Sequence, residues 1–444
     1  MIVPTIPPRV ATSPWTNRRT GMSPTDATRF FGSGTAPTSS ESVGFDLDLV
    51  TGLVAFFAGL LTAFTVSVVG EMPVGELVLF AVAGWVVLNV LVTRHWPSAL
   101  LRHKLFWILL GAQMLALGAY VFSDLYCGSS THDIARGWGR MVFLSVDLLA
   151  MAYLAGCSAR NFSLYLIGQL AGDFAHSIFF GALFGDWWKF GAGIPVTYLL
   201  FALAIRGGPY LTVCVAFGMA LLHLLLDFRS FGGICVLVGV LTGMQLLPRA
   251  LRPWLAPAIL GASLGGFLVY QQIHQNDAHR STRSDVSRSA MMIAAWEAIE
   301  RHPLTGNGSW FSHSDVWDNF MIIRRDRARL AHVGGFPEAN EDPGTVAFHT
   351  QILVSLAEGG IFGGTFFIVF GSLLVHALYS LAFTRLWRRH YPIFGLVLVT
   401  ALWNVFFSPF SGAHRVYIAA ACGVLLLFHT EGDRPDLNPR RILR

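Results

Sequence analysis

The sequence predicts an all-α polytopic membrane protein with about twelve transmembrane helices and one large helical loop. Of its 444 residues, 54% are hydrophobic and only 13% are charged. A soluble domain carries about 25% charged residues, so this composition excludes an ordinary soluble protein. Two further observations support the prediction. Apolar segments long enough to cross a bilayer follow one another along the chain, and basic residues follow every second segment.

The apolar segments define the expected helices. A hydrocarbon core about 30 Å thick needs roughly 20 apolar residues in helical conformation. The pattern predicts helices at about 49–69, 74–93, 105–123, 141–157, 162–184, 193–205, 209–226, 231–247, 255–270, 358–383, 391–409 and 416–429.

The basic residues define the predicted topology, because Lys and Arg concentrate in cytoplasmic loops. They follow the second, fourth, sixth, eighth, tenth and twelfth segments, so both termini are expected in the cytoplasm. The predicted organisation is a disordered cytoplasmic tail at 1–45, helices one to nine at 46–270, an outward-facing loop at 271–348, helices ten to twelve at 349–430 and a cytoplasmic tail at 431–444. Within the large loop, residues 291–301 have a helical pattern, and His302-Pro303 is expected to end that helix.

Arginines in the outward loops are the first candidate binding residues. The positive-inside rule disfavours them there, and a guanidinium group binds phosphate through a planar fork of donors. The candidates are Arg229, Arg288 and Arg415, together with Arg283. Arg229 has a structural alternative in a pair with the neighbouring Asp227. The alternative for Arg415 is a side chain that extends to the membrane interface. The alternative for Arg283 is a solvated charge in a loop.

His349 is the candidate general base, because it stands between the polar loop and an apolar helix. A neutral imidazole accepts a proton near neutral pH. The alternative interpretation is a residue at the helix N-terminus with a capping role. No set of acidic, His or Cys residues has the spacing of a known metal motif, so neither a metal nor a cofactor is predicted. No basic, aromatic-interleaved patch indicates a nucleic acid partner.

Motifs around these residues carry a resemblance to a known family. Arg288 precedes a short helix and the turn HPLTGNG at 302–308. A second motif consists of His349, Glu358, Gly360 and Gly363. A weaker third match is the segment DFRS at 227–230. Together they resemble the O-antigen ligase and polymerase superfamily of bacterial envelope glycosyltransferases.

The resemblance implies a metal-independent, inverting transferase of the GT-C type in the bacterial inner membrane, with the large loop and the active site facing the periplasm. The donor would be polysaccharide on undecaprenyl diphosphate, and the acceptor would be the lipid A–core oligosaccharide of lipopolysaccharide. Membrane lipids would surround the protein. The resemblance assigns His349 as the base and Arg288 and Arg229 as diphosphate ligands. Arg415, Arg283 and Glu358 are further candidates.

Three other functions remain open. An O-antigen polymerase would extend the glycan on its lipid carrier, and a protein O-oligosaccharyltransferase would transfer the glycan to protein. A transporter of lipid-linked glycan would place charged residues near the midplane of broken helices. Here Asp147 and Asp173 are the main charges within predicted helices, and most polar groups gather at the outer ends. This distribution favours an enzyme at the membrane interface over a transporter.

Overall fold

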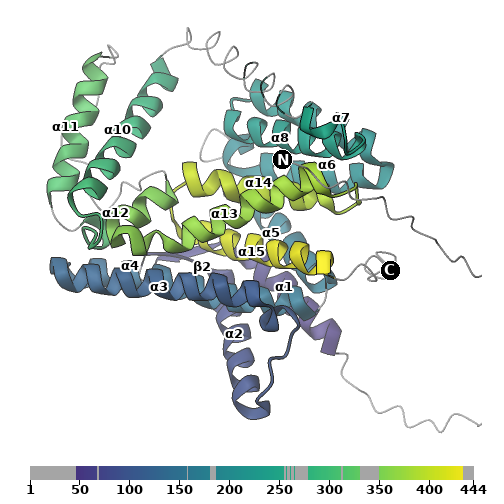
Figure 1. Cartoon of the computed structure of the whole chain (residues 1–444), viewed down its shortest axis with the longest axis horizontal. Helices are drawn as coiled ribbons and strands as arrows, with labels where there is room; N and C mark the ends of the chain where they lie inside the picture. Colours follow the sequence, from purple (N-terminus) through teal and green to yellow (C-terminus); the bar gives the residue numbers. More distant parts are fainter. Residues whose placement is uncertain are drawn as a thin grey trace, which may run out of the picture. The chain divides into compact units, whose positions relative to one another are not determined.

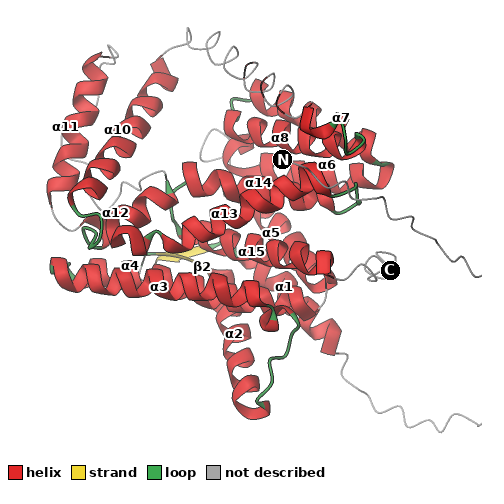
Figure 2. Cartoon of the chain, in the orientation of Figure 1, coloured by secondary structure: helices red, strands yellow, loops and turns green. Residues whose placement is uncertain are grey.

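The computed structural model describes residues 47–67, 70–157, 159–180, 187–254, 257, 261, 265, 279–311, 314–330 and 350–433. Almost all of them are helical (Figure 2). Six helices of this part are long and apolar enough to cross a membrane. They are α2 (Val74–Thr93), α3 (Lys104–Cys127), α4 (Thr131–Cys157), α8 (Arg229–Leu246), α13 (Thr365–Tyr379) with the π-helix η7 (Ser380–Thr384), and α15 (Gly412–Asp433). The chain is therefore an all-α membrane protein, and the number of twelve spans stays a prediction.

Figure 1 shows the other helices of the described part, which are shorter or more polar. The short apolar ones are α1 (Leu47–Leu61), α6 (Gly193–Gly207), α7 (Pro209–Leu225), α12 (Gln351–Gly363) and α14 (Tyr391–Phe407). Helix α5 (Ala159–Phe180) has the length to span a membrane, but polar residues interrupt its apolar sequence. The short helices η2 (Leu100–Arg102) and η4 (Trp188–Ala192) precede α3 and α6. The ninth predicted segment, 255–270, falls outside the described ranges except at three single positions.

The predicted loop at 124–140 is mostly helix, which corrects the expected boundaries. Helix α3 continues to Cys127 and ends at Gly128, whose φ of 69° allows its N–H to bond to the Asp124 carbonyl. Helix α4 begins at Thr131, and the Ser130 hydroxyl accepts a hydrogen bond from the Asp133 N–H. Charged residues in this segment lowered its hydropathy, but both capping signals were present in the sequence.

Two other predicted segments also have different boundaries. The first, 49–69, contains most of α1 and then the strand β1 (Thr65–Ser67), which pairs antiparallel with β2 (Glu71–Pro73) just beyond the segment. The tenth, 358–383, begins inside α12 and continues through α13 and η7, so two helices replace the single predicted one. The backbone of α12 leaves helical geometry at Gly360, where φ is 65°. A glycine adopts this conformation without the strain that a side chain would cause.

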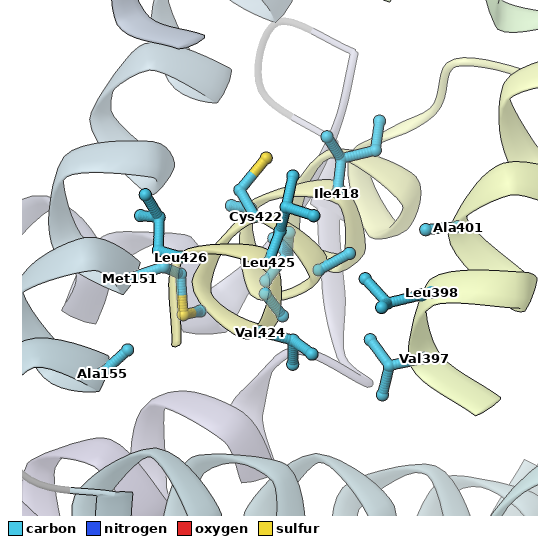
Figure 3. Packing of buried hydrophobic residues seen from close by; sticks show 14 of the residues in the cluster. Met151, Ala155, Val397, Leu398, Ala401, Ile418, Cys422, Val424, Leu425 and Leu426 are labelled. Atoms are coloured by element: carbon cyan, nitrogen blue, oxygen red, sulfur yellow. The ribbon is translucent and has the colours of Figure 1, made fainter. Parts of the chain in front are cut away.

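The core of the helical bundle is built around α15 (Figure 3). Met151 and Ala155 of α4 approach it from one side, and Val397, Leu398 and Ala401 of α14 approach it from the other. Residues of α15 such as Leu425 and Val424 are fully buried between them. This packing brings α15 beside α14, which precedes it directly, and beside α4 from the first half of the chain.

The large loop folds into a pair of neighbouring helices, α10 (His279–Arg301) and α11 (Ser314–Leu330), joined through η5 (Ser309–Phe311) (Figure 1). Helix α10 is longer than the predicted 291–301 segment and ends before His302-Pro303, as predicted. A separate apolar cluster joins the two helices to α12. It contains Ala294, Phe320 and Ala357. The loop helices are therefore anchored to the bundle through α12.

Candidate functional site

The two sequence motifs meet in space through their glycines. Gly306 of the HPLTGNG turn has a φ of 72°, and Gly360 of α12 has a φ of 65°. A Cβ atom on Gly306 would lie 2.2 Å from the Glu358 carbonyl oxygen, and one on Gly360 would lie 2.3 Å from the Leu304 carbonyl oxygen. Any side chain at either position would separate the two backbones. Both glycines are required by a close approach of segments about 50 residues apart.

Backbone hydrogen bonds complete this contact. The Asn307 N–H donates to the Ala357 carbonyl at 2.9 Å, and the Ile361 N–H donates to the Pro303 carbonyl at 2.8 Å. The buried Asn307 amide also donates to the Ala357 carbonyl at 2.8 Å and to the Ala298 carbonyl at 3.1 Å. The Asn307 side chain therefore joins the end of α10 to α12. Helix α10 and the N-terminal half of α12 form one hydrogen-bonded unit.

Glu358 of α12 belongs to this unit, and its side chain is almost completely buried. Its carboxylate forms an ion pair with Arg140 of α4, which is also buried. It accepts further hydrogen bonds from the Tyr120 hydroxyl of α3 at 2.7 Å and from the Trp310 N–H at 2.9 Å. These partners occupy both carboxylate oxygens. Glu358, a candidate site residue from the sequence, is thus held by α3, α4 and η5.

A second buried carboxylate also holds the segment that follows the HPLTGNG turn. Asp124 of α3 accepts hydrogen bonds from the Ser309 N–H at 2.5 Å, the Ser309 hydroxyl at 2.8 Å and the Trp138 indole at 2.8 Å. The Ser123 hydroxyl of α3 donates to the Glu358 carbonyl at 2.7 Å. The ends of α3 and α4 therefore fix the position of the turn, and through it the position of α10.

A cavity of about 900 Å³ adjoins this unit. Helices α5, α6, α8, α10, α14 and α15 contribute to its wall, and so does the π-helix η4. Most of the wall is apolar, with aromatic side chains such as Phe231, Trp403 and Phe407. Polar side chains, such as those of Gln169 and Asn404, lie between the apolar ones. Pockets of this size accommodate organic ligands of several hundred Å³.

Arg288 is the predicted arginine that the structure places on this wall. It is exposed and lines the cavity beside Ser289, Met291 and Met292 of α10. Because α10 is fixed through Asn307 and the glycine contact, the position of Arg288 is set by the two motifs. Its side chain therefore brings a positive charge to the α10 side of the cavity wall.

The other predicted arginines lie elsewhere. The Arg229 Nε donates to the Asp227 carboxylate at 3.0 Å, which is the structural alternative expected from the sequence. Its neighbours on both sides, Phe228 and Ser230, line the cavity. Arg415 is buried and donates to both carboxylate oxygens of Glu76, at 3.1 and 2.9 Å. The side chain of Arg283 lies outside the described part of the chain.

His349 also lies outside the described residues. The helix that follows it begins at Gln351, with Thr350 as its N-cap. The Thr350 hydroxyl accepts a hydrogen bond from the Leu353 N–H at 3.3 Å. Thr350 therefore performs the capping role that was the structural alternative for His349. The assignment of His349 as a base stays a prediction.

The cavity wall includes polar residues that the sequence did not identify as site residues. Lys189 of η4 and His414 of α15 add two ionisable groups, and the His414 Nδ1 is 2.7 Å from the Ser411 hydroxyl. Gln169 and Asp173 of α5 add an amide and a carboxylate. Their signal in the sequence was a pair of polar residues four positions apart within an apolar segment. No protein-family model and no curated protein matches this chain.

Proposed function

We propose that the protein is an O-antigen ligase, which transfers polysaccharide from undecaprenyl diphosphate to the lipid A–core oligosaccharide at the periplasmic side of the bacterial inner membrane. The observation that carries the proposal is the position of Arg288. It lines a largely apolar cavity among apolar helices, and both resembling motifs hold its helix in place. An apolar wall with a fixed guanidinium group suits a lipid that carries a diphosphate.

The chemistry divides between a base and a cation. His349 takes the proton of the acceptor hydroxyl while its oxygen attacks the anomeric carbon of the donor. The bond from that carbon to the diphosphate oxygen breaks, and the negative charge that develops there is stabilised by Arg288. Attack opposite the leaving group inverts the anomeric carbon. In this proposal the arginine performs the charge stabilisation that a metal ion performs in other transferases, so activity survives chelators.

A matched pair of arginine variants tests the proposal in a transfer assay with purified full-length protein. Arg288→Lys keeps the charge but loses the planar fork, so transfer is expected to fall at least tenfold. Arg325→Lys is the control, because Arg325 is exposed on α11 and does not line the cavity. His349→Gln is expected to lower transfer about 10²–10⁴-fold without weakening donor binding. Wild-type transfer by Arg288→Lys would contradict the proposal.

A strain that lacks the gene distinguishes a ligase from the alternative functions. Loss of a ligase leaves the polymer on its lipid carrier and the lipid A–core bare. Loss of a polymerase leaves one glycan repeat attached to the core. Loss of a protein O-oligosaccharyltransferase leaves lipopolysaccharide unchanged and removes glycan from proteins. Electrophoresis of lipopolysaccharide and of glycoproteins from that strain distinguishes the three results.

A further inference from the structure

Two polar residues of α5 lie on the cavity wall, and no described residue bonds to their side chains. Gln169 and Asp173 lie one helical turn apart and both line the cavity wall. Within the described part of the chain, neither side chain makes a hydrogen bond or an ion pair. An ionisable residue within an apolar helix is costly to maintain and marks a functional site by default. A ligand in the cavity would supply the missing partners.

The direction in which these residues point is set by the packing of α5 on α1. A Cβ atom on Gly168 would lie 2.0 Å from the Phe56 carbonyl oxygen, and one on Gly172 would lie 2.2 Å from the Leu60 carbonyl oxygen. The glycine face of α5 must therefore lie directly on α1. Gln169 and Asp173 each follow one of these glycines, about 100° further around the helix. Their orientation toward the cavity is built into the helix contact.

The α14 wall of the same cavity offers complementary groups. The Ser408 hydroxyl donates to the Asn404 side-chain oxygen at 2.8 Å, which leaves the Asn404 amide N–H groups for another acceptor. Trp403 adds an aromatic surface. The cavity thus combines a carboxylate, two amides and an aromatic ring. Carboxylates and amides together accept from and donate to adjacent hydroxyl groups, and an aromatic ring packs against the C–H face of a sugar.

We propose that Gln169 and Asp173 bind hydroxyl groups of the sugar that is attached to the diphosphate of the donor. The Asp173 carboxylate accepts two hydroxyl hydrogens, and the Gln169 amide both donates and accepts. This inference rests on the proposed function, because Arg288 places the diphosphate in the same cavity. It adds a recognition site for the first sugar, on a helix that the motifs do not include.

Binding of two lipids to the purified full-length protein tests this site. The probes are undecaprenyl diphosphate carrying N-acetylglucosamine and undecaprenyl diphosphate without a sugar. Wild-type protein is expected to bind the first about 10- to 100-fold more tightly, since a hydrogen bond to a charged group typically contributes that factor. Asp173→Asn and Gln169→Leu are expected to remove most of this difference and to leave binding of the sugar-free lipid unchanged. Asp318→Asn, on the exposed surface of α11, is the matched control.

Each other result overturns a defined part of the inference. Equal binding of the two lipids by wild-type protein excludes sugar recognition. If Asp173→Asn and Gln169→Leu weaken the binding of both lipids equally, these residues support the fold or bind the diphosphate and do not recognise the sugar. A large fall in kcat with unchanged binding in Asp173→Asn makes Asp173 a catalytic base instead. If wild-type protein binds neither lipid, the proposed function itself fails. If Arg288→Lys weakens the binding of both lipids while Asp173→Asn weakens the binding of neither, the sugar site is refuted and the proposed function is not.

Discussion

At the scale of single residues, two side chains that the sequence predicted as candidate site residues form buried ion pairs. Glu358 binds Arg140, and Arg415 binds Glu76. Both pairs join helices that are distant in the sequence. A buried charge whose partner is removed is strongly destabilising, so these pairs fix helix positions. The Glu358–Arg140 pair holds α12 against α4, and the Arg415–Glu76 pair holds α15 against α2.

Glu358→Gln tests this structural role. The substitution leaves the Arg140 charge buried without a counter-charge, so the free energy of unfolding is expected to fall by about 3–5 kcal/mol. The control is Glu297→Gln, because Glu297 forms an exposed pair with Arg301 at 4.0 Å and such pairs contribute about 0–1 kcal/mol. Thermal unfolding in detergent measures both. A double substitution of Arg140 and Glu358 by methionine is expected to recover part of the loss. Equal melting of the two single variants would contradict the role.

What the sequence predicted at this scale depended on local spacing. The end of α10 before His302-Pro303 and the turn with two glycines follow from rules that need only neighbouring residues. The partner of Glu358 did not follow. Arg140 lies about 200 residues earlier, in a segment whose charges indicated a loop. Such a pair is decided by tertiary packing, which a single sequence does not reveal.

At the scale of secondary structure elements, the contact between α1 and α5 decides which face of α5 meets the cavity. Small residues at a helix interface allow the backbones to approach closely, as in membrane proteins generally. Gly59 of α1 takes part from the other side, where a Cβ atom would lie 2.0 Å from the Tyr165 carbonyl oxygen. The spacing of Gly168 and Gly172 was visible in the sequence. Their partner helix was not, because the same spacing suits several neighbours.

Gly168→Ala is expected to force α1 and α5 apart. An added methyl group at a packed position costs about 1–3 kcal/mol, so the melting temperature should fall and binding of the glycosylated lipid should weaken. Gly118→Ala is the matched control, because Gly118 of α3 has no atom within 4 Å of an added Cβ. There the higher helix propensity of alanine is expected to stabilise the protein by up to about 1 kcal/mol. Equal effects of the two substitutions would show that the α1–α5 contact tolerates separation.

At the scale of the whole molecule, the sequence predicted the class of protein better than the helix boundaries. Composition alone indicated apolar helices, and six helices of the described part are long and apolar enough to cross a membrane. The boundaries moved where charged residues lie within a helix, as in α4, or where an apolar segment contains a break, as at Gly360. Hydropathy averages over both features, because it measures the transfer of a segment into lipid and not the contacts that form there.

The predicted topology can be tested with single cysteines in a protein whose five native cysteines are replaced. The loop that contains α11 is expected outside and the connection after α2 inside, because Arg94, Arg102 and Lys104 follow α2. A membrane-impermeant maleimide should therefore label Asp326→Cys in intact cells and His95→Cys only after permeabilisation. Both positions are exposed, so a lack of labelling cannot result from burial. The reverse pattern would place α11 and the neighbouring α10, with Arg288, on the cytoplasmic side. A glycan assembled on its carrier at the periplasmic side would then have no access to the base or to the arginine.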